Sequence, residues 1–337
     1  MRKKYLLRFT PLEPYFLGGE NTFRVNQRSK YFAASLPVPS ATTVLGTLRY
    51  LLLELNGALN SDGKYTPQQQ QVCDALIGPK SYCVGGENKF GKLLSVSPVF
   101  LTDGEAFYIK TPLNCKVACL QTNYQAMELG QQQYATSFGC SLRFPLPGNY
   151  SAKDTVSEQS YMRLSDGKIL NDLFLPVTKV GITKGKPDQA FFKKTYYSLK
   201  KGFSFAVIAE FDGDLSAENT FCHMGREKSP FLLQATETDL DIESEIKVSL
   251  AARSGTAFYY VFGDTFVQDP FSYSDFALVQ TAYVRMLRSD IRNQALNVTC
   301  SDAFYQLLRA GSVLYGDDLH NGFETNMGYN KIINIEV

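Results

Sequence analysis

The residues of this sequence best suited to chemistry are small polar side chains that precede an apolar helix, in the stretch SLPVPSATTVLGTLRYLLLEL (35–55). Ser40 is a good N-cap, and Thr42 and Thr43 follow it in the first turn. Hydroxyls and free N–H groups at the positive end of a helix suit a phosphate oxygen. We expect Arg49, two turns further on, to reach the same rim. A capped core helix with Gly46 at a helix–sheet contact is the simpler alternative.

Cations gather in two other segments. The loop before the helix carries Arg24, Arg28 and Lys30. Residues 179–201 hold seven lysines and one acid, so their local charge is 7 − 1 = +6. Turn residues at the centre of that segment predict a projecting hairpin. Its candidate RNA-binding lysines are Lys179, Lys184, Lys186, Lys193 and Lys194.

Aromatic residues lie among these lysines, namely Phe191, Phe192, Tyr196 and Tyr197. Lysines bind phosphates and rings stack on bases, which together are typical of single-strand RNA contact. A surface hairpin whose rings face the core fits the pattern about equally well.

Signatures of an enzyme are missing from the sequence. It has no Walker-type loop, no G-x-S-x-G and no H-E-x-x-H. His223 lies beside Arg226 and Lys228 and could serve as the general base of a ribonuclease, although a lone histidine is more often structural. Seven irregularly spaced cysteines and two histidines favour free thiols over disulfides or zinc. We therefore expect no catalysis, no metal and no cofactor.

Charge and hydropathy further limit which classes of protein the sequence fits. The net charge is +1, so nucleic-acid binding would have to come from local clusters of cations. Arg8 interrupts the apolar run that a signal peptide needs, and no apolar run reaches the length of about 20 residues that a membrane span needs. These features predict a cytoplasmic protein without membrane contact.

The elements that must position these residues read as strand, helix and hairpin. We predict a strand closed by Pro11, helices over 42–55 and 69–76, and a hairpin turning at Asp103-Gly104. This order is the first half of a ferredoxin-like or RRM-like domain.

The same logic restarts near residue 195. Its predicted elements are a strand over 203–211, a short helix over 214–225, a strand over 229–236, a strand pair over 245–263 turning at Ser254-Gly255, a helix or strand over 274–293, and closing strands over 310–318 and 330–337.

The predicted fold class is therefore α+β, with two ferredoxin-like domains and an inserted basic hairpin. The predicted boundaries are 1–112 for the N-terminal domain, 113–194 for the insertion and 195–337 for the C-terminal domain.

Three stretches resemble one family, the third Cmr subunit of type III-B CRISPR effector complexes, within the RAMP superfamily. FTPLEPYFLGGENTF followed by RSKYFAASLPVPSATTVLGTLR is similar to the family's N-terminus. KVGITKGKPDQAFFKKTYYSL and AGSVLYG are similar to later family segments. Two loops depart from the family pattern: Arg226 replaces a glycine in MGREKS, and GYNKIINI keeps only Gly328 and Tyr329 of a glycine-rich end.

The resemblance implies a non-catalytic scaffold subunit that holds the 5′ handle of the CRISPR RNA. Its implied protein partners are the large polymerase-type subunit and the backbone RAMP subunits, with the protruding hairpin contacting the guide. The candidate RNA-binding residues outside the hairpin are Arg24, Arg28, Lys30, Ser40, Thr42, Thr43, Arg49, Arg226 and Lys228.

Two other functions stay open. A RAMP endoribonuclease that processes repeat RNA would use His223 as its base. A protein-interaction subunit would make no direct RNA contact. The acidic stretch ETDLDIESE (237–245) would repel RNA, so it is expected to face solvent or a basic protein neighbour.

Overall fold

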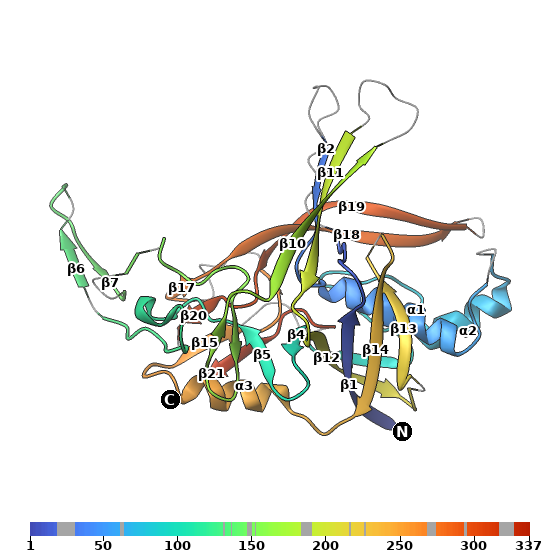
Figure 1. The fold of residues 1–337 in the computed structure, drawn as a ribbon, viewed down its shortest axis with the longest axis horizontal. Coiled ribbons are helices and arrows are strands. Elements are labelled where there is room, and N and C mark those ends of the chain that lie inside the picture. Colours follow the sequence, from blue (N-terminus) through green and yellow to red (C-terminus); the bar gives the residue numbers. More distant parts are fainter. Residues whose placement is uncertain are drawn as a thin grey trace.

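The computed structural model describes residues 1–18, 31–60, 64–130, 132–135, 137–146, 150–151, 153–182, 191–215, 217–225, 227–267, 274–292, 295–316 and 327–337. Within these ranges the protein is a mixed α/β molecule of few helices and mostly antiparallel sheets (Figure 1).

The largest sheet brings together strands that lie far apart in the chain, from β1 to β14. Its order is β13-β14-β1-β12-β4-β5-β8-β9, and β3 also pairs with β12. The strands are β1 Arg2–Pro11, β3 Leu93–Val96, β4 Phe100–Thr102, β5 Phe107–Lys110, β8 Tyr161–Arg163, β9 Ile169–Leu170, β12 Ser204–Asp212, β13 Asn219–Met224 and β14 Ser229–Glu237. The N-terminal strand β1 lies between β12 and β14, so the sheet forms only when distant segments meet.

Three α-helices and one short 3-10 helix accompany the sheets in the described residues. They are α1 Ala41–Leu55, α2 Pro67–Ile77, α3 Ile242–Ala251 and η1 Val117–Cys119. Each α-helix starts at a polar cap. Ser40 accepts from the Thr43 N–H, Thr66 forms a capping box with Gln69, and Asp241 accepts from the Glu243 and Ser244 N–H groups.

Two hydrophobic cores cover the two faces of the large sheet. Because side chains alternate along a strand, Phe205 and Val207 of β12 pack in one core and Ala206 and Ile208 in the other. The leucines of α1 fill the first core, and Ile242, Ile246 and Leu250 of α3 fill the second. Strand β12 is buried on both faces, which explains its continuous apolar sequence.

Smaller sheets surround this body. One has the order β10-β11-β2, a second β17-β20-β15-β21, a third β16-β19-β18, and β6 pairs with β7. Their bounds are β2 Tyr31–Ala34, β6 Gln132–Ala135, β7 Ser141–Phe144, β10 Phe174–Ile182, β11 Phe191–Leu199, β15 Phe258–Val261, β16 Thr265–Phe266, β17 Phe276–Leu278, β18 Thr281–Arg292, β19 Ala295–Leu308, β20 Val313–Tyr315 and β21 Ile332–Ile335. Figure 1 shows the β2, β10 and β11 strands projecting from the body and the β18–β19 ribbon lying across it.

Most predicted elements are confirmed. The first strand ends at Pro11, both N-terminal helices form, and β4 and β5 turn at Asp103-Gly104. Gly104 has a φ of 96°, and the Asp103 carboxylate accepts from the N–H groups of Glu105 and Ala106. Strands β12, β14, β20 and β21 also lie where they were predicted.

Two predicted elements are wrong. The short helix over 214–225 is instead the strand β13, because Cys222 and Met224 alternate inward while the strand pairs with β14. The first strand of the pair over 245–263 is instead the helix α3, whose buried residues follow a spacing of four. The ambiguous stretch 274–293 contains the strands β17 and β18.

The large sheet contains strands from all three predicted segments of the chain. The predicted domain boundaries and the two ferredoxin-like domains stay predictions. In the part of the chain that the structure describes, no helix is long and apolar enough to span a membrane. The cytoplasmic location also stays a prediction.

Candidate nucleic-acid interface

The predicted basic hairpin is present and projects from the body (Figure 1). Strands β10 and β11 pair antiparallel, with Lys179 opposite Lys194 and Val180 opposite Lys193. Strand β2 adds to β11 in parallel, with Tyr31 opposite Phe192. Lys184, Lys186, Arg24, Arg28 and Lys30 lie outside the described residues. The residues that flank both basic segments, however, are neighbours in one sheet.

Cations and rings alternate at the base of this hairpin. The Lys179 Nζ lies 4.5 Å from the centre of the Tyr196 ring, which in turn lies 5.4 Å from the Phe16 ring. The Lys194 Nζ lies 5.6 Å from the Phe16 ring and 2.6 Å from the Glu227 carboxylate. The face that carries Lys179 and Lys194 is therefore partly neutralised by an acid that the sequence analysis did not single out.

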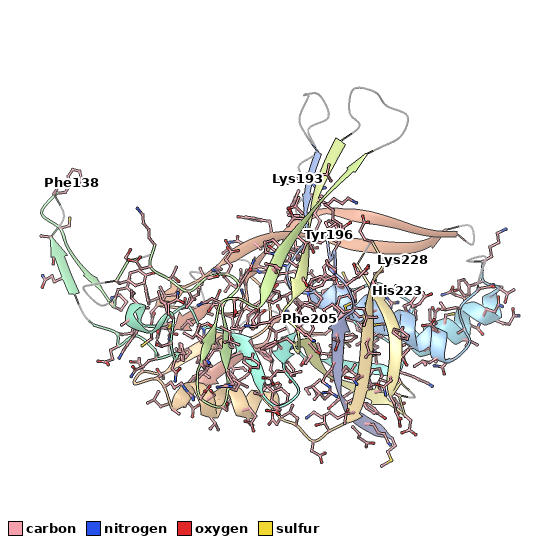
Figure 2. All side chains as sticks on the ribbon, viewed as in Figure 1. Phe138, Lys193, Tyr196, Phe205, His223 and Lys228 are labelled. Carbon is pink, nitrogen blue, oxygen red and sulfur yellow. The ribbon has the colours of Figure 1, made fainter. Side chains whose placement is uncertain are left out.

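The opposite face of the hairpin is different. Lys193 is exposed, while Tyr197 accepts a hydrogen bond from Gln159 and packs against the first core. Figure 2 shows Lys193 further along the projecting hairpin than Tyr196. Of the two described tyrosines, Tyr197 thus follows the expectation of a core-facing ring, and Tyr196 is packed between a lysine and a phenylalanine.

The start of α1 lies next to the base of the hairpin, because the Ser35 N–H donates to the Thr195 carbonyl of β11. Ser40 caps the helix as predicted, and its Oγ lies 3.2 Å from the Thr42 hydroxyl and 2.9 Å from the Thr43 hydroxyl. The Thr42 hydroxyl also lies 3.4 Å from the Tyr329 hydroxyl. These groups form one small polar cluster at the positive end of the helix.

The C-terminal segment supports this cluster. A Cβ at Gly328 would lie 3.0 Å from the Ala41 Cβ, and Gly328 has a φ of 84°. Tyr329 is buried beside it and reaches Thr42. The glycine and tyrosine that the family resemblance singled out in GYNKIINI thus pack directly on the first turn of α1.

Arg49 does not behave as the sequence analysis expected. Its Nε donates to the Ile77 carbonyl at 3.0 Å and its Nη2 to the Gly78 carbonyl at 3.2 Å. Its guanidinium also lies 5.3 Å from the centre of the Phe90 ring. Burial lowers the pKa of Arg49. The side chain therefore joins α1 to the end of α2, and contact with phosphate stays a prediction.

Gly46 also differs from expectation. It is exposed, and a Cβ placed on it would have no neighbour within 4 Å. The expected helix–sheet contact at Gly46 is therefore wrong. At this one position α1 is open to solvent and carries no side chain.

The turn between β13 and β14 completes the interface. Gly225 has a φ of 73°, and a Cβ there would lie 2.4 Å from the Phe16 carbonyl oxygen, so only glycine fits. Lys228 is exposed, with a φ of 52°. Arg226 lies outside the described residues. The Thr47 hydroxyl donates to the His223 carbonyl at 3.3 Å, which ties the turn to α1.

His223 is an exposed residue of β13 (Figure 2). Among the described residues its imidazole takes part in no hydrogen bond or ion pair. In the same part of the chain, no three His, Cys, Asp or Glu side chains gather as metal ligands would.

The site residues that sequence analysis missed are Phe16 and Glu227. Both meet Lys194 only because the segment after β1, strand β11 and the β13–β14 turn converge in the fold. Glu227 lies between Arg226 and Lys228 in the sequence, which is a weak signal for a paired acid.

Comparison with known proteins places the chain among CRISPR-associated proteins. Residues 7–262 match the family model described as CRISPR-associated protein (Cas_Cmr3), which is more than half of the chain. The chain belongs to the Cas_Cmr3 family, and the resemblance to the third Cmr subunit of type III-B complexes is confirmed. No curated protein matches it in sequence.

Several solved structures are similar in outline. A type III-B Cmr-β complex bound to cognate target RNA contains a chain 13% identical, with a TM-score of 0.48, covering 93% of this chain and 86% of that chain. A Csm3–Csm4 subcomplex gives 9% identity, a TM-score of 0.40 and 94% coverage of both chains. A Csm1–Csm4 cassette in complex with pppApA contains a chain 10% identical, with a TM-score of 0.33; the match covers 99% of this chain and 94% of that chain. With TM-scores below 0.5, none of them bears on function.

Proposed function

We propose that this chain is a non-catalytic, RNA-binding scaffold subunit of a type III-B CRISPR effector complex. It holds the 5′ handle of the CRISPR RNA beside the large polymerase-type subunit, and it meets the backbone subunits through the projecting hairpin. The observation that carries the proposal is the joining of the hairpin base, the β13–β14 turn and the start of α1 into one surface in a member of the Cas_Cmr3 family.

The chemistry of this surface suits a single-stranded phosphate chain. Lys179 and Lys193 are exposed cations on the two faces of the β10–β11 hairpin, and Lys228 is an exposed cation of the β13–β14 turn. The Lys179 ammonium, which lies over the Tyr196 ring, and the open backbone at Gly46 offer a cation and uncovered backbone to a sugar–phosphate chain. An overall charge of +1 is compatible with such binding because the cations are gathered locally.

Salt dependence of RNA binding tests the proposal. Each phosphate contact on single-stranded RNA contributes about 0.7 to the slope of log K against log salt. The triple variant Lys179→Ala, Lys193→Ala, Lys228→Ala should therefore lower the slope by about 2 relative to wild type. Lys247→Ala is the matched control, because Lys247 is an exposed lysine of α3, whose buried residues pack in the second core.

A second measurement uses the assembled complex with its guide RNA. Photocrosslinking should place the handle on residues 24–49, 179–201 and 225–229. Crosslinks confined to α3 and the β6–β7 hairpin, with an unchanged slope in the triple variant, would contradict the proposal and favour a protein-interaction subunit.

The endoribonuclease alternative has its own test. Purified full-length chain is incubated with repeat RNA in EDTA, with His223→Ala as the comparison. We expect no site-specific product from either protein. A specific cut by wild type that His223→Ala abolishes would replace the scaffold proposal with the nuclease.

A further inference from the structure

The outer face of the β18–β19 ribbon carries exposed rings that the proposed interface does not use. In this ribbon Val284 lies opposite Tyr305, Arg285 opposite Phe304, and Tyr283 opposite Gln306. Val284 and Tyr305 pack against the first core, so they define the inner face. By alternation, Tyr283, Arg285 and Phe304 share the outer face.

These three residues form a compact aromatic and cationic group. The Tyr283 side chain is 72% exposed and the Phe304 side chain 62%. The Arg285 guanidinium lies 3.8 Å from the centre of the Phe304 ring. Tyr283 and Phe304 are diagonal neighbours in the register, a spacing of about 7–8 Å between Cα atoms. Two consecutive nucleotides of an extended strand can therefore cover the Tyr283 ring and the Arg285 guanidinium that lies over Phe304.

The ribbon adjoins the start of α1 through a chain of rings. On the inner face, the Tyr305 ring lies 5.8 Å from Phe266, and Phe266 lies 4.9 Å from Tyr329. Tyr329 touches the Thr42 hydroxyl at the first turn of α1. The strand layer and the rings of Tyr305, Phe266 and Tyr329 thus lie between the outer face and the polar cluster at the start of the helix.

Charge favours nucleic acid over protein as the occupant. Residues 281–308 contain three arginines and two aspartates and no lysine or glutamate, so their formal charge is 3 − 2 = +1. A ring with a guanidinium over it, beside a second open ring, is the arrangement that receives unpaired bases. An apolar protein partner would leave the Arg285 charge to be desolvated.

We infer that Tyr283, Arg285 and Phe304 form a stacking site for unpaired bases of single-stranded RNA, separate from the cations of the hairpin. The inference rests on the proposed RNA-binding function and adds a second point of contact. One base stacks on the Tyr283 ring and the next on the Arg285 guanidinium that Phe304 supports, and the sugar–phosphate chain stays on the solvent side.

The test separates bases from phosphates. Full-length protein is titrated with a short single-stranded RNA and with an abasic ribose–phosphate oligomer of the same length. The double variant Tyr283→Ala, Phe304→Ala should bind the RNA about 5- to 150-fold more weakly for each stacked base that is lost. Its affinity for the abasic oligomer and its salt slope should stay at the wild-type values, because no phosphate contact is removed.

Control variants keep the result interpretable. Tyr283→Phe retains the ring and should retain wild-type affinity, which also reports that the ribbon folds. Phe138→Ala removes a ring that is 92% exposed on the separate β6–β7 hairpin and should change neither titration. Figure 2 shows Phe138 far from the ribbon. Arg285→Lys keeps the charge and loses the planar group, so it should weaken RNA binding without altering the salt slope.

Four results would overturn the inference. Equal weakening for RNA and abasic oligomer would assign the effect to phosphates. Unchanged RNA affinity, together with loss of the variant from the assembled complex, would make the face a protein-docking surface. If the wild-type protein binds neither oligomer, the proposed RNA-binding function is refuted as well. If the salt slope depends on the lysines as expected but the ring variants have no effect, only the stacking site is refuted.

Discussion

Replacing Arg49 should destabilise the contact between α1 and α2 rather than remove a phosphate contact. The guanidinium donates to the Ile77 and Gly78 carbonyls, at 3.0 and 3.2 Å. Hydrogen bonds from a charged donor contribute about 1.5–3 kcal/mol each, so Arg49→Ala should lower the free energy of unfolding by about 3 kcal/mol. Helix α2 has no basic residue in its last turn, so Arg49 is also the cation that complements the negative end of its dipole.

Arg49→Lys distinguishes the two roles of the residue. A lysine keeps the charge, but a single ammonium lacks the planar fork that reaches two carbonyls, so about half of the 3 kcal/mol should be lost. A phosphate-binding role instead predicts that lysine preserves both stability and the salt slope. Tyr50→Ala, at the next position of α1, is the control, because Tyr50 is exposed and its loss should change stability by about 0.5 kcal/mol or less.

Urea unfolding measures the stability, and amide hydrogen exchange locates the loss. We expect the exchange protection of α2 to fall first, because α2 packs mainly on α1 and its end is fixed by Arg49. The reasoning is refuted if Arg49→Ala stays within about 0.5 kcal/mol of wild type while its salt slope for RNA falls by about 0.7.

Three further predictions follow from single contacts. Glu227→Gln should raise RNA affinity a few-fold in a filter-binding titration, because it removes an acid, and with it the negative partner of Lys194, from the interface. Gly46→Ala should raise stability to urea by about 1 kcal/mol, since alanine is the better helix former and meets no neighbour, and should weaken RNA binding if the strand approaches α1 there. Burial lowers the pKa of Lys110 to about 8, so the unfolded chain binds more protons above that pH. The stability of wild type relative to Lys110→Met should therefore rise by about 1.4 kcal/mol per pH unit between pH 8 and 10, in unfolding curves measured across that range; a flat difference would contradict it.

Elements governed by local signals were predictable from the sequence. Ser40 and Thr66 are caps, and the apolar positions that follow them repeat with the period of a helix. Asp103-Gly104 carries the turn chemistry of β4 and β5. In each case the residues that decide the structure are close in the sequence, so no tertiary contact was needed to recognise it.

The two wrong elements have a tertiary cause. Asn219–Met224 is a strand because it pairs with β14 at the edge of the large sheet, and its short alternation competes with a helix pattern. Helix α3 was obscured because its exposed positions include Val248, which makes the sequence look strand-like. The acidic stretch 237–245 that was expected to face solvent or a partner includes the α3 N-cap Asp241 and the first-turn residues Glu243 and Glu245.

The sequence predicted which residues belong to the candidate site, but it did not predict which of them contact one another. The lysines of 179–201, the capped start of α1 and Lys228 were identified by residue type, since cations and caps are visible in a sequence. The pairing of Lys194 with Glu227, and of Arg49 with the end of α2, depends on contacts that span 33 and 28 or 29 residues. No local pattern indicates which carbonyl an arginine will reach.

The two loops that depart from the family pattern keep the residues on which the fold depends. Gly225 is retained, and any side chain there would strike the Phe16 carbonyl. Gly328 and Tyr329 are retained, and they pack on Ala41 and Thr42 at the start of α1. In both loops the glycine that remains is required by close contacts inside the protein, so replacing it should lower the stability of the fold. The altered residues of the C-terminal loop are held by the fold as well, because Asn330 is buried with its Oδ1 accepting from the Phe266 N–H, and the Lys331 Nζ lies 2.7 Å from the Glu243 carboxylate. The departure from the family pattern in this loop is therefore matched by contacts inside the protein.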